Sequence, residues 1–457
     1  MKGKKPETKG RHHIIKNFGR KINPPQYLAL GFFGMIFMGS LLLRIPISWN
    51  SGVQVKYLDA LFTATSAVCV TGLNVVDTAD SYSIFGQIVI MLLIQFGGLG
   101  FMTTAVVASL LLGKKRLSLK DRRVIQEALG PVAVQDLSQI IWRIIKVTLV
   151  IELTGALLLG FGWLGQFGPR AFYLGLFHSV SAFNNAGFDL MGKFQSLAQF
   201  NGNGFILSII MLLIVLGGLG YAVIGELLRY YKRHRLSLNS KIVLVTTFVL
   251  LAAGFVGILA LEANNPSTLG AMSVRDKVLN AMFFSVTPRT AGFATLNVGA
   301  MSQATMFLIV LLMAIGASPG STGGGIKTTT FATVISARWS DIRRKRYPVM
   351  FRRRIDLDTV ARADTIFVLY LTLIVVSSMV LTISENTPFI KALLETVSAA
   401  ATVGLTTGIT PGLTSIGKVT LIITMYAGRV GPLTLAYAVA KEGRQLYDYP
   451  KDDIMLS

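Results

Sequence analysis

The sequence predicts an all-α polytopic membrane protein whose helices repeat as four tandem units, and three observations carry that prediction. The 457-residue chain is 52% hydrophobic and only 14% charged, whereas soluble domains carry roughly 25% charged residues. Its basic residues gather in alternate gaps between long apolar stretches, and a short apolar segment that ends at a glycine recurs four times. A water-soluble enzyme of two or three domains is therefore strongly disfavoured.

Eight apolar stretches are long enough to cross a bilayer as a helix, which takes about 20 residues. The first starts after 25 residues, is too long for the apolar core of a signal peptide and lacks a small-residue cleavage site, so we expect it to be a span. The single cysteine, Cys69, makes an intrachain disulfide impossible. The predicted spans are 26–47, 84–112, 140–163, 204–228, 241–262, 303–335, 363–384 and 416–440.

The distribution of charge predicts how these spans are oriented. Lys and Arg outnumber Asp and Glu by 44 to 22. The basic residues concentrate in both terminal tails and in the second, fourth and sixth gaps, whereas the other gaps hold one or two each, such as Lys56, Lys193 and Lys391. This positive-inside pattern predicts that both termini are cytoplasmic. The basic run 343–354 would also suit nucleic acid, but topology explains it, so we expect no nucleic-acid partner.

Each of the four outward gaps contains an apolar stretch of about a dozen residues, which is too short to span the bilayer. The glycines that end these stretches, Gly72, Gly187, Gly292 and Gly404, lie 115, 105 and 112 residues apart. A second landmark follows each glycine at offsets of 25, 30, 24 and 24, at Gly97, Gly217, Gly316 and Gly428. Two landmarks in step indicate a fourfold repeat of one structural unit.

Four short helices that enter the membrane from outside and stop within it favour a cation pore. The C-terminus of a helix carries the negative end of its dipole, and irregular backbone at membrane depth is tolerated only beside protein or a water-filled cavity. Glycine and small residues after each short helix allow backbone carbonyls to replace a cation's water shell. The predicted fold is therefore four tandem helix–pore-helix–helix units around a pseudo-fourfold central pore.

Two other classes of function were weighed against a pore. An alternating-access carrier also uses broken helices at the midplane, but its inverted repeats need an odd number of spans, and each unit here has two. That carrier stays open as an alternative. A membrane-embedded enzyme is disfavoured because the sequence shows no recognisable Ser-His-Asp set, metal cluster or pair of catalytic carboxylates.

The predicted span 303–335 is interrupted by five glycines and a proline within ten residues. Each glycine costs a helix about 1 kcal/mol and a proline about 3 kcal/mol relative to alanine, so we expect an irregular loop inside the membrane. A phosphate-binding loop is disfavoured because Ile326 separates Gly325 from Lys327 and the context is a membrane span. A passive kink is the alternative.

Arg429 is a second anomaly, because it lies in the middle of the last predicted span. A central arginine costs about 2.5–3.5 kcal/mol on insertion scales unless it finds partners or water. The carbonyls that the interrupted helix leaves free are candidate partners. The alternative is that Arg429 lines a wet cavity.

Four triplets at the ends of the short helices resemble the selectivity filters of the Ktr/Trk/HKT potassium transporters: Val70-Thr71-Gly72, Asn185-Ala186-Gly187, Thr290-Ala291-Gly292 and Thr402-Val403-Gly404. Segments 95–101 and 316–330 resemble the inner helices of that family. The resemblance covers about 25–440 and is strongest to the membrane subunits of bacterial Ktr systems. It implies potassium uptake through a homodimer of pores, with sodium dependence in some members. It also implies gating by a cytoplasmic, octameric, nucleotide-binding ring of the KtrA type.

We expect the filter to use backbone carbonyls of the first two residues of each triplet, with the glycine making the turn. A single glycine per repeat, unlike the Thr-Val-Gly-Tyr-Gly of tetrameric channels, leaves the strictness of potassium over sodium open, so a less selective monovalent-cation transporter is a second alternative. The resemblance implies that the intramembrane loop is a gate contacted by an arginine. The gating residues are expected to be Gly316, Ser318, Pro319, Gly320, Gly323, Gly324, Gly325, Lys327 and Arg429.

The remaining expectations concern organisation and partners. Beyond potassium, and sodium as a possible second ion, we expect no cofactor on this chain, with nucleotide bound by the partner subunit. The protein should reside in the plasma membrane, in contact with lipid. The predicted segments are a cytoplasmic tail 1–25, repeats 26–112, 113–231, 232–337 and 338–440, and a cytoplasmic tail 441–457.

Overall fold

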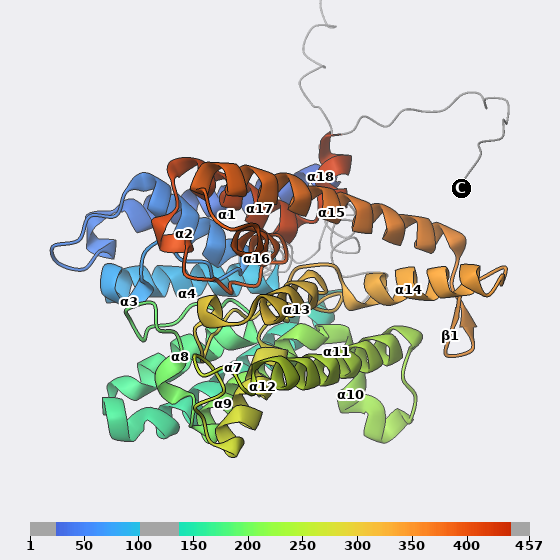
Figure 1. Cartoon of the computed structure of the whole chain (residues 1–457), viewed down its shortest axis with the longest axis horizontal. Coiled ribbons are helices and arrows are strands. Elements are labelled where there is room, and N and C mark those ends of the chain that lie inside the picture. Colours follow the sequence, from blue (N-terminus) through green and yellow to red (C-terminus); the bar gives the residue numbers. More distant parts are fainter. Residues whose placement is uncertain (1–23, 101–136, 440–457) are drawn as a thin grey trace, which may run out of the picture.

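The computed structural model describes residues 24–100 and 137–439, which form four successive units of helix, short helix and helix (Figure 1). Unit 1 consists of α1 (Pro24–Arg44), α2 (Tyr57–Cys69), α3 (Thr78–Ser81) and α4 (Ile84–Leu99). Unit 2 consists of α7 (Leu137–Phe167), α8 (Arg170–Phe183), α9 (Gly204–Leu219) and α10 (Tyr221–Arg233).

Units 3 and 4 follow the same order and are joined by a small hairpin. Unit 3 consists of α11 (Leu238–Glu262), α12 (Val274–Val286), α13 (Gln303–Ala314) and α14 (Thr328–Ile342). The antiparallel strands β1 (Val349–Met350) and β2 (Arg353–Arg354) connect it to unit 4. Unit 4 consists of α15 (Leu357–Glu385), α16 (Phe389–Ala400), α17 (Ser415–Val430) and α18 (Pro432–Val439). Single 3-10 turns lie at Pro46–Ser48, Ala198–Phe200, Val298–Ala300 and Thr410–Gly412.

The packing of the helices closes the four units into a ring. Within each unit the first helix packs on the short helix, as α1 on α2 and α7 on α8. Between units, the helix that follows each short helix packs on the short helix of the next unit: α4 on α8, α9 on α12, α13 on α16, and α17 on α2. The last contact joins unit 4 back to unit 1. The predicted architecture of four helix–pore-helix–helix units is therefore confirmed.

The first helix of each unit is long and apolar enough to cross a membrane: Pro25–Arg44, Ile141–Phe167, Leu238–Glu262 and Leu357–Glu385. The second long helix of each unit is instead short or bent. Helices α4 and α13 are apolar but shorter, α9 and α10 meet at 101°, and α17 and α18 meet at 91°. Eight spans are consistent with this pattern, and the bends at 204–228 and 416–439 were not predicted. Residues 101–112 of the predicted span 84–112 lie outside the described residues.

Glycine explains where these helices end. Gly100, Gly220 and Gly431 follow α4, α9 and α17 with φ of 83°, 90° and 93° and ψ of 140°, 143° and 128°. A positive φ with an extended ψ is open to glycine and strained for any other residue. In three units the helix after the short helix therefore ends at a glycine with the same backbone shape, while in unit 3 it ends at the loop 315–327.

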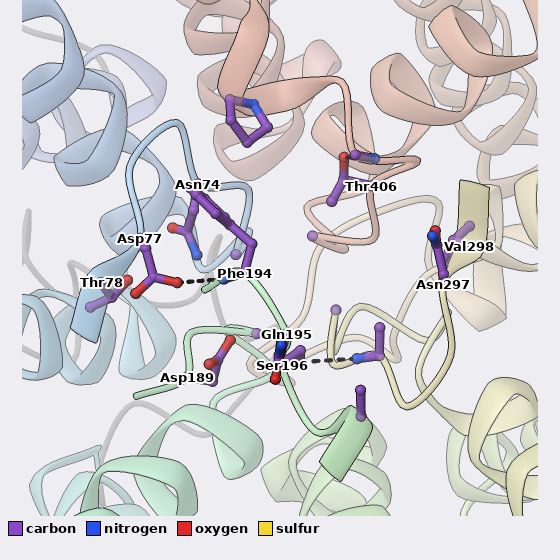
Figure 2. A pocket seen from close by; sticks show the side chains of 18 of the residues that line it. Asn74, Asp77, Thr78, Asp189, Phe194, Gln195, Ser196, Asn297, Val298 and Thr406 are labelled. Carbon is purple, nitrogen blue, oxygen red and sulfur yellow. Dashed lines mark hydrogen bonds between the residues drawn. The ribbon is translucent and has the colours of Figure 1, made fainter. Parts of the chain in front are cut away.

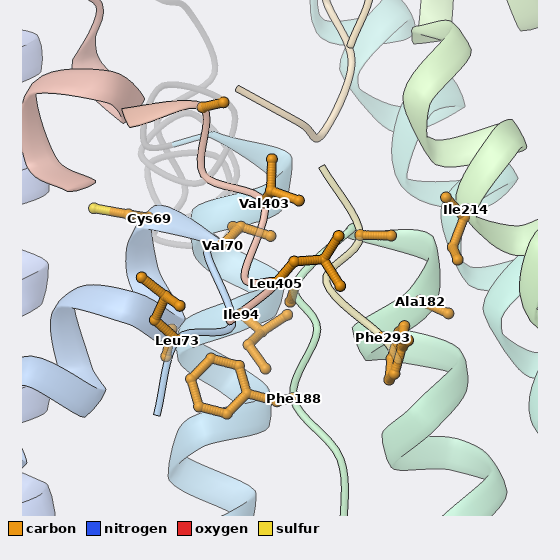
Figure 3. Packing of buried hydrophobic residues seen from close by; sticks show 14 of the residues in the cluster. Cys69, Val70, Leu73, Ile94, Ala182, Phe188, Ile214, Phe293, Val403 and Leu405 are labelled. Carbon is orange, nitrogen blue, oxygen red and sulfur yellow. The ribbon is translucent and has the colours of Figure 1, made fainter. Parts of the chain in front are cut away.

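The core holds the irregular segments that follow the short helices. The residue after each glycine is large, apolar and no more than 1% exposed: Leu73, Phe188, Phe293 and Leu405. Figure 3 shows these side chains among the neighbouring helices. Because the side chain after each glycine is packed tightly in the core, it holds the backbone of the neighbouring triplet in place.

Candidate pore and intramembrane loop

The four predicted filter triplets adopt one backbone shape. The first residue of each triplet is left-handed, with φ of 57° at Val70, 57° at Asn185, 69° at Thr290 and 51° at Thr402. Each glycine also has a positive φ, between 70° and 95°. A positive φ at the first and the third residue of each triplet turns the chain sharply after each short helix. The same turn at four sites shows that the sequence repeat is a repeat of structure.

The four glycines meet around one axis in a closed ring. A Cβ atom built on any one of them would lie against the carbonyl oxygen that precedes the glycine of the next unit. The distances are 2.5 Å from Gly72 to Ala186 O, 2.7 Å from Gly187 to Ala291 O, 2.3 Å from Gly292 to Val403 O, and 2.2 Å from Gly404 to Thr71 O. The fourth contact returns to unit 1. The structure therefore brings all twelve predicted filter residues together, and it explains why each triplet ends in glycine, since a side chain there would meet the carbonyl of the next unit.

Hydroxyl groups of the short helices fix this ring, and the sequence analysis missed them. Ser66 and Ser398 accept hydrogen bonds from the backbone N–H groups of Gly72 and Gly404, at 3.0 Å and 2.9 Å. Ser181 and Thr287 donate to the carbonyls of Phe188 and Phe293, at 2.7 Å and 2.6 Å. The signal was present in the sequence, as a hydroxyl six residues before each glycine, or five in unit 3.

A cavity of about 470 Å³ opens on one side of the ring, with the four glycines among its lining residues. Figure 2 shows its side chains, which come from all four units. Two residues beyond the glycines, the four units contribute Asn74, Asp189, Ala294 and Thr406, so the cavity has one carboxylate at this level. Burial raises the pKa of Asp189 to about 7, and the neighbouring Asp77 adds to the rise.

Asp77 has a structural role in the same cavity. Its carboxylate accepts hydrogen bonds from Ala79 N and Asp80 N at the start of α3, at 2.9 Å and 3.0 Å. It also accepts one from Phe194 N at 2.7 Å (Figure 2). Ser196 in turn accepts from Ala294 N at 3.2 Å. The segment after the second filter is therefore tied to units 1 and 3 across the cavity.

The predicted irregular loop lies on the other side of the ring. Thr322 donates to Asn185 Oδ1 at 3.2 Å. A Cβ atom on Gly323 would lie 2.0 Å from Thr290 Oγ1, and one on Gly324 would lie 2.3 Å from Thr402 Oγ1. The loop therefore touches the first filter residue of units 2, 3 and 4. This position is directly beneath the ring, as the sequence predicted.

Backbone hydrogen bonds hold the loop in place, some to unit 2 and some within the loop itself. Ser318 N donates to Gly218 O at 3.0 Å, and Gly320 O accepts from Tyr221 N at 3.0 Å, where α9 bends into α10. Gly316 N donates to Ile326 O at 3.0 Å, and Gly325 has φ of 71° and packs on Gly316. Pro319 O lies against Gly220. Because these groups are paired with backbone, the irregular segment is satisfied inside the membrane.

Three cationic side chains donate to carbonyls of this loop. Lys327 Nζ donates to Gly323 O at 2.6 Å, and Arg289 Nη2 donates to Gly316 O at 3.3 Å. Arg429, at the end of α17 rather than in the middle of a span, donates to Thr322 O and to Gly97 O of α4. None of the ion pairs among the described residues involves these three side chains. The sequence analysis predicted Lys327 and Arg429 but did not single out Arg289.

The second glycine landmark is a site of close packing. A Cβ atom on Gly97, Gly217 or Gly428 would lie 2.1, 1.8 or 1.9 Å from a carbonyl oxygen near the end of the short helix, at Val68, Phe183 and Ala400. Only glycine allows the two helices to approach this closely. Among the described residues no three His, Cys, Asp or Glu side chains are grouped to hold a metal.

Comparisons with known proteins agree with this geometry. A family model described as TrkH, cation transport protein, matches residues 33–446. The chain is 40% identical over 435 residues to the Ktr system potassium uptake protein B of Bacillus subtilis, covering 95% of this chain and 97% of that protein. It is 39% identical over 449 residues to the potassium/sodium uptake protein NtpJ of Enterococcus hirae, covering 96% and 99%.

A solved structure shares the fold. The potassium transporter TrkH from Vibrio parahaemolyticus superposes with a TM-score of 0.71 at 19% identity, covering 94% of this chain and 87% of that chain. The long apolar helices and the family match together identify a multi-pass membrane protein rather than an enzyme. On the extent of the family match and of the identities, the chain belongs to the TrkH family of cation transport proteins.

Proposed function

We propose that this chain carries potassium into the cell through the central pore, and that its filter is built from backbone carbonyls. The closed ring in which each glycine faces the carbonyl of the next unit carries the proposal. Such a ring can offer a cation four sets of oxygens in place of water. The names of the relatives, which are uptake proteins for potassium or for potassium and sodium, support the choice of ion.

The filter uses neutral oxygens at every level, which suits a monovalent ion that must leave again. Its ligands are the carbonyls of Val70 and Thr71, Asn185 and Ala186, Thr290 and Ala291, and Thr402 and Val403. The short helices α2, α8, α12 and α16 direct the negative ends of their dipoles toward these residues. Sodium as a second transported ion is the alternative that the potassium/sodium uptake protein supports.

The intramembrane loop is the gate in this proposal. It lies against the first filter residue of three units, so an ion cannot leave the ring on this side while the loop keeps its position. Arg429 fastens the loop to α4, and Lys327 fastens it to its own backbone. Opening requires the hydrogen bond from Arg429 to the loop to break, and a bond from such a charged donor contributes about 1.5–3 kcal/mol.

The same proposal assigns orientation and partners. Both termini and the basic hairpin β1–β2 are cytoplasmic by the positive-inside rule, and Figure 1 shows the hairpin beyond the end of α14. The name "system … protein B" of the Bacillus relative designates one component of several. We place a homodimer of this chain on an octameric KtrA-like ring, with nucleotide on the ring and lipid headgroups near the hairpin.

Ion flux in liposomes tests the proposal. Gly72→Ser and Gly404→Ser place a side chain against Ala186 O and Thr71 O, so we expect the K⁺ flux to fall and the K⁺/Na⁺ flux ratio to approach one. Gly52→Ser is the matched control, because Gly52 also has a positive φ, of 86°, but has no atom within 4 Å of a built Cβ. K⁺ flux and selectivity that survive both filter substitutions would overturn the pore.

A further inference from the structure

Arg289 is a charged residue next to the third filter triplet, and the ring of glycines and carbonyls has no need of its charge. It lies three residues before Gly292, where the other units have Cys69, Asn184 and Ala401, and it is 6% exposed. A buried guanidinium at membrane depth is costly unless it is paired. No ion pair of the described residues includes it, so its partners must be sought among neutral groups.

Its backbone and its side chain connect different parts of the pore. Helix α12 ends at Val286, six residues before Gly292, whereas the other short helices end three or four residues before their glycines. Arg289 O accepts a hydrogen bond from Asn185 Nδ2 of the second filter triplet at 3.0 Å. Its Nη2 donates to Gly316 O, the first residue of the predicted gating loop, at 3.3 Å. Arg289 thus links the filter segments of units 2 and 3 to the loop.

The other arm of the guanidinium faces a small cavity. Nη1 of Arg289 is buried and has no hydrogen-bond partner. The cavity, of about 10 Å³, is lined by Arg289, Val286, Thr247 of α11, and Ile214, Val215 and Gly218 of α9. Thr247 is 7% exposed, and its Oγ1 also lacks a partner. Two buried, unpaired polar groups therefore line one space of the size of a single water molecule.

We propose that this cavity binds one water, which accepts from Arg289 Nη1 and is hydrogen-bonded to Thr247 Oγ1. The water completes the hydrogen bonds of a guanidinium whose other arm fixes Gly316. Arg289 is then a positioning residue, and it couples the filter segment of unit 3 and helix α11 to the start of the loop. The positioning role rests on the proposed function of the loop as a gate. The water site does not depend on that function.

The water is tested by a high-resolution structure of the purified protein. We expect a density peak within hydrogen-bonding distance of both Arg289 Nη1 and Thr247 Oγ1. The isosteric substitution Thr247→Val should remove the peak, because the water keeps too few polar partners. An empty cavity in the wild-type protein, or a peak that persists in Thr247→Val, would overturn the site whatever ion the protein carries.

The positioning role is tested by K⁺ flux in liposomes without any regulatory subunit. Arg289→Met should raise this unregulated flux about tenfold, the effect of losing one hydrogen bond from a charged donor, with an unchanged K⁺/Na⁺ ratio. Arg289→Lys keeps the charge and should restore part of the wild-type behaviour. Arg275→Met is the control, because Arg275 is an exposed arginine on the same helix.

Each outcome of the flux experiment is decisive for variants that elute as folded protein. Unregulated flux that stays at the wild-type level in Arg289→Met contradicts the coupling to the loop. A changed K⁺/Na⁺ ratio assigns Arg289 to the filter instead and contradicts it as well. Absence of K⁺ flux in the wild-type protein both with and without its regulatory subunit defeats the proposed function itself and leaves the water site to be judged by the density.

Discussion

At the scale of single residues, the pore depends on side chains whose roles follow from contacts with residues far away in the sequence. The filter glycines could be predicted because four copies recur at a nearly constant spacing. Arg289 could not, because its partners Gly316 and Asn185 are far from it in sequence. Ser66 and Ser398 could have been found from their fixed distance to the glycines, but a serine in a short helix has many other uses.

Asp189 provides a residue-scale prediction, because it is the one carboxylate among the four equivalent residues beyond the filter glycines. A negative charge in a cation entrance raises the local concentration of K⁺. We expect Asp189→Asn to raise the K⁺ concentration for half-maximal flux roughly two- to tenfold at low salt, with little change at saturation. The measurement is flux against K⁺ concentration at pH 8, above the pKa of about 7.

The control for this prediction moves the charge to another unit. Asn74 occupies the equivalent position in unit 1, so Asp189→Asn combined with the isosteric Asn74→Asp should recover the wild-type concentration dependence. Recovery shows that the charge acts through the cavity that the units share. Failure to recover, with both proteins folded, would show that Asp189 acts by local structure through Met191 N.

Arg429 provides the second residue-scale prediction. Its guanidinium joins Thr322 O of the loop to Gly97 O of α4. Arg429→Ala should therefore raise unregulated K⁺ flux and weaken regulation, by about tenfold, while the K⁺/Na⁺ ratio stays near wild type. Flux and regulation that are both unaltered in reconstituted protein would contradict this role.

At the scale of elements, the breaks in the helices divide into those the sequence predicts and those it does not. Five glycines and a proline within ten residues predict the break in the span 303–335 of the third unit. The bends at Gly220 and Gly431 were missed, since an isolated glycine costs a helix only about 1 kcal/mol and is often tolerated. Only the packing of the loop against α9 reveals why the chain must turn there.

Gly220 gives the prediction for this scale. Its φ of 90° disfavours any side chain, and a Cβ atom would lie 2.6 Å from Pro319 O of the loop. We expect Gly220→Ala to destabilise the protein by on the order of 1–3 kcal/mol, measured as a lower temperature of thermal unfolding in detergent. Gly225→Ala, within helix α10, is the control and should leave stability equal or slightly higher. Equal stability of the two variants would contradict the account of the bend.

At the scale of the whole molecule, the sequence predicts a symmetric pore, and the structure reveals how each unit departs from it. The repeat and the ring followed from the spacing of the glycines. The asymmetric features are the loop in unit 3, Arg289 beside it, Asp189 in unit 2 and Arg429 in unit 4. The loop and Arg429 were singled out from the sequence, whereas Arg289 and Asp189 were not, because the contact of Arg289 with unit 2 and the shared cavity around Asp189 arise only in the fold.

The central claim is that a cation is held on the axis by the carbonyls of the four filter triplets. Anomalous scattering from crystals grown with Rb⁺, which has nearly the size of K⁺, tests it most directly. We predict Rb⁺ peaks on the axis, surrounded by the carbonyl oxygens of Thr71, Ala186, Ala291 and Val403, and their loss in Gly72→Ser. Well-ordered crystals with no peak on the axis, or with Rb⁺ bound only elsewhere in the protein, would contradict the claim.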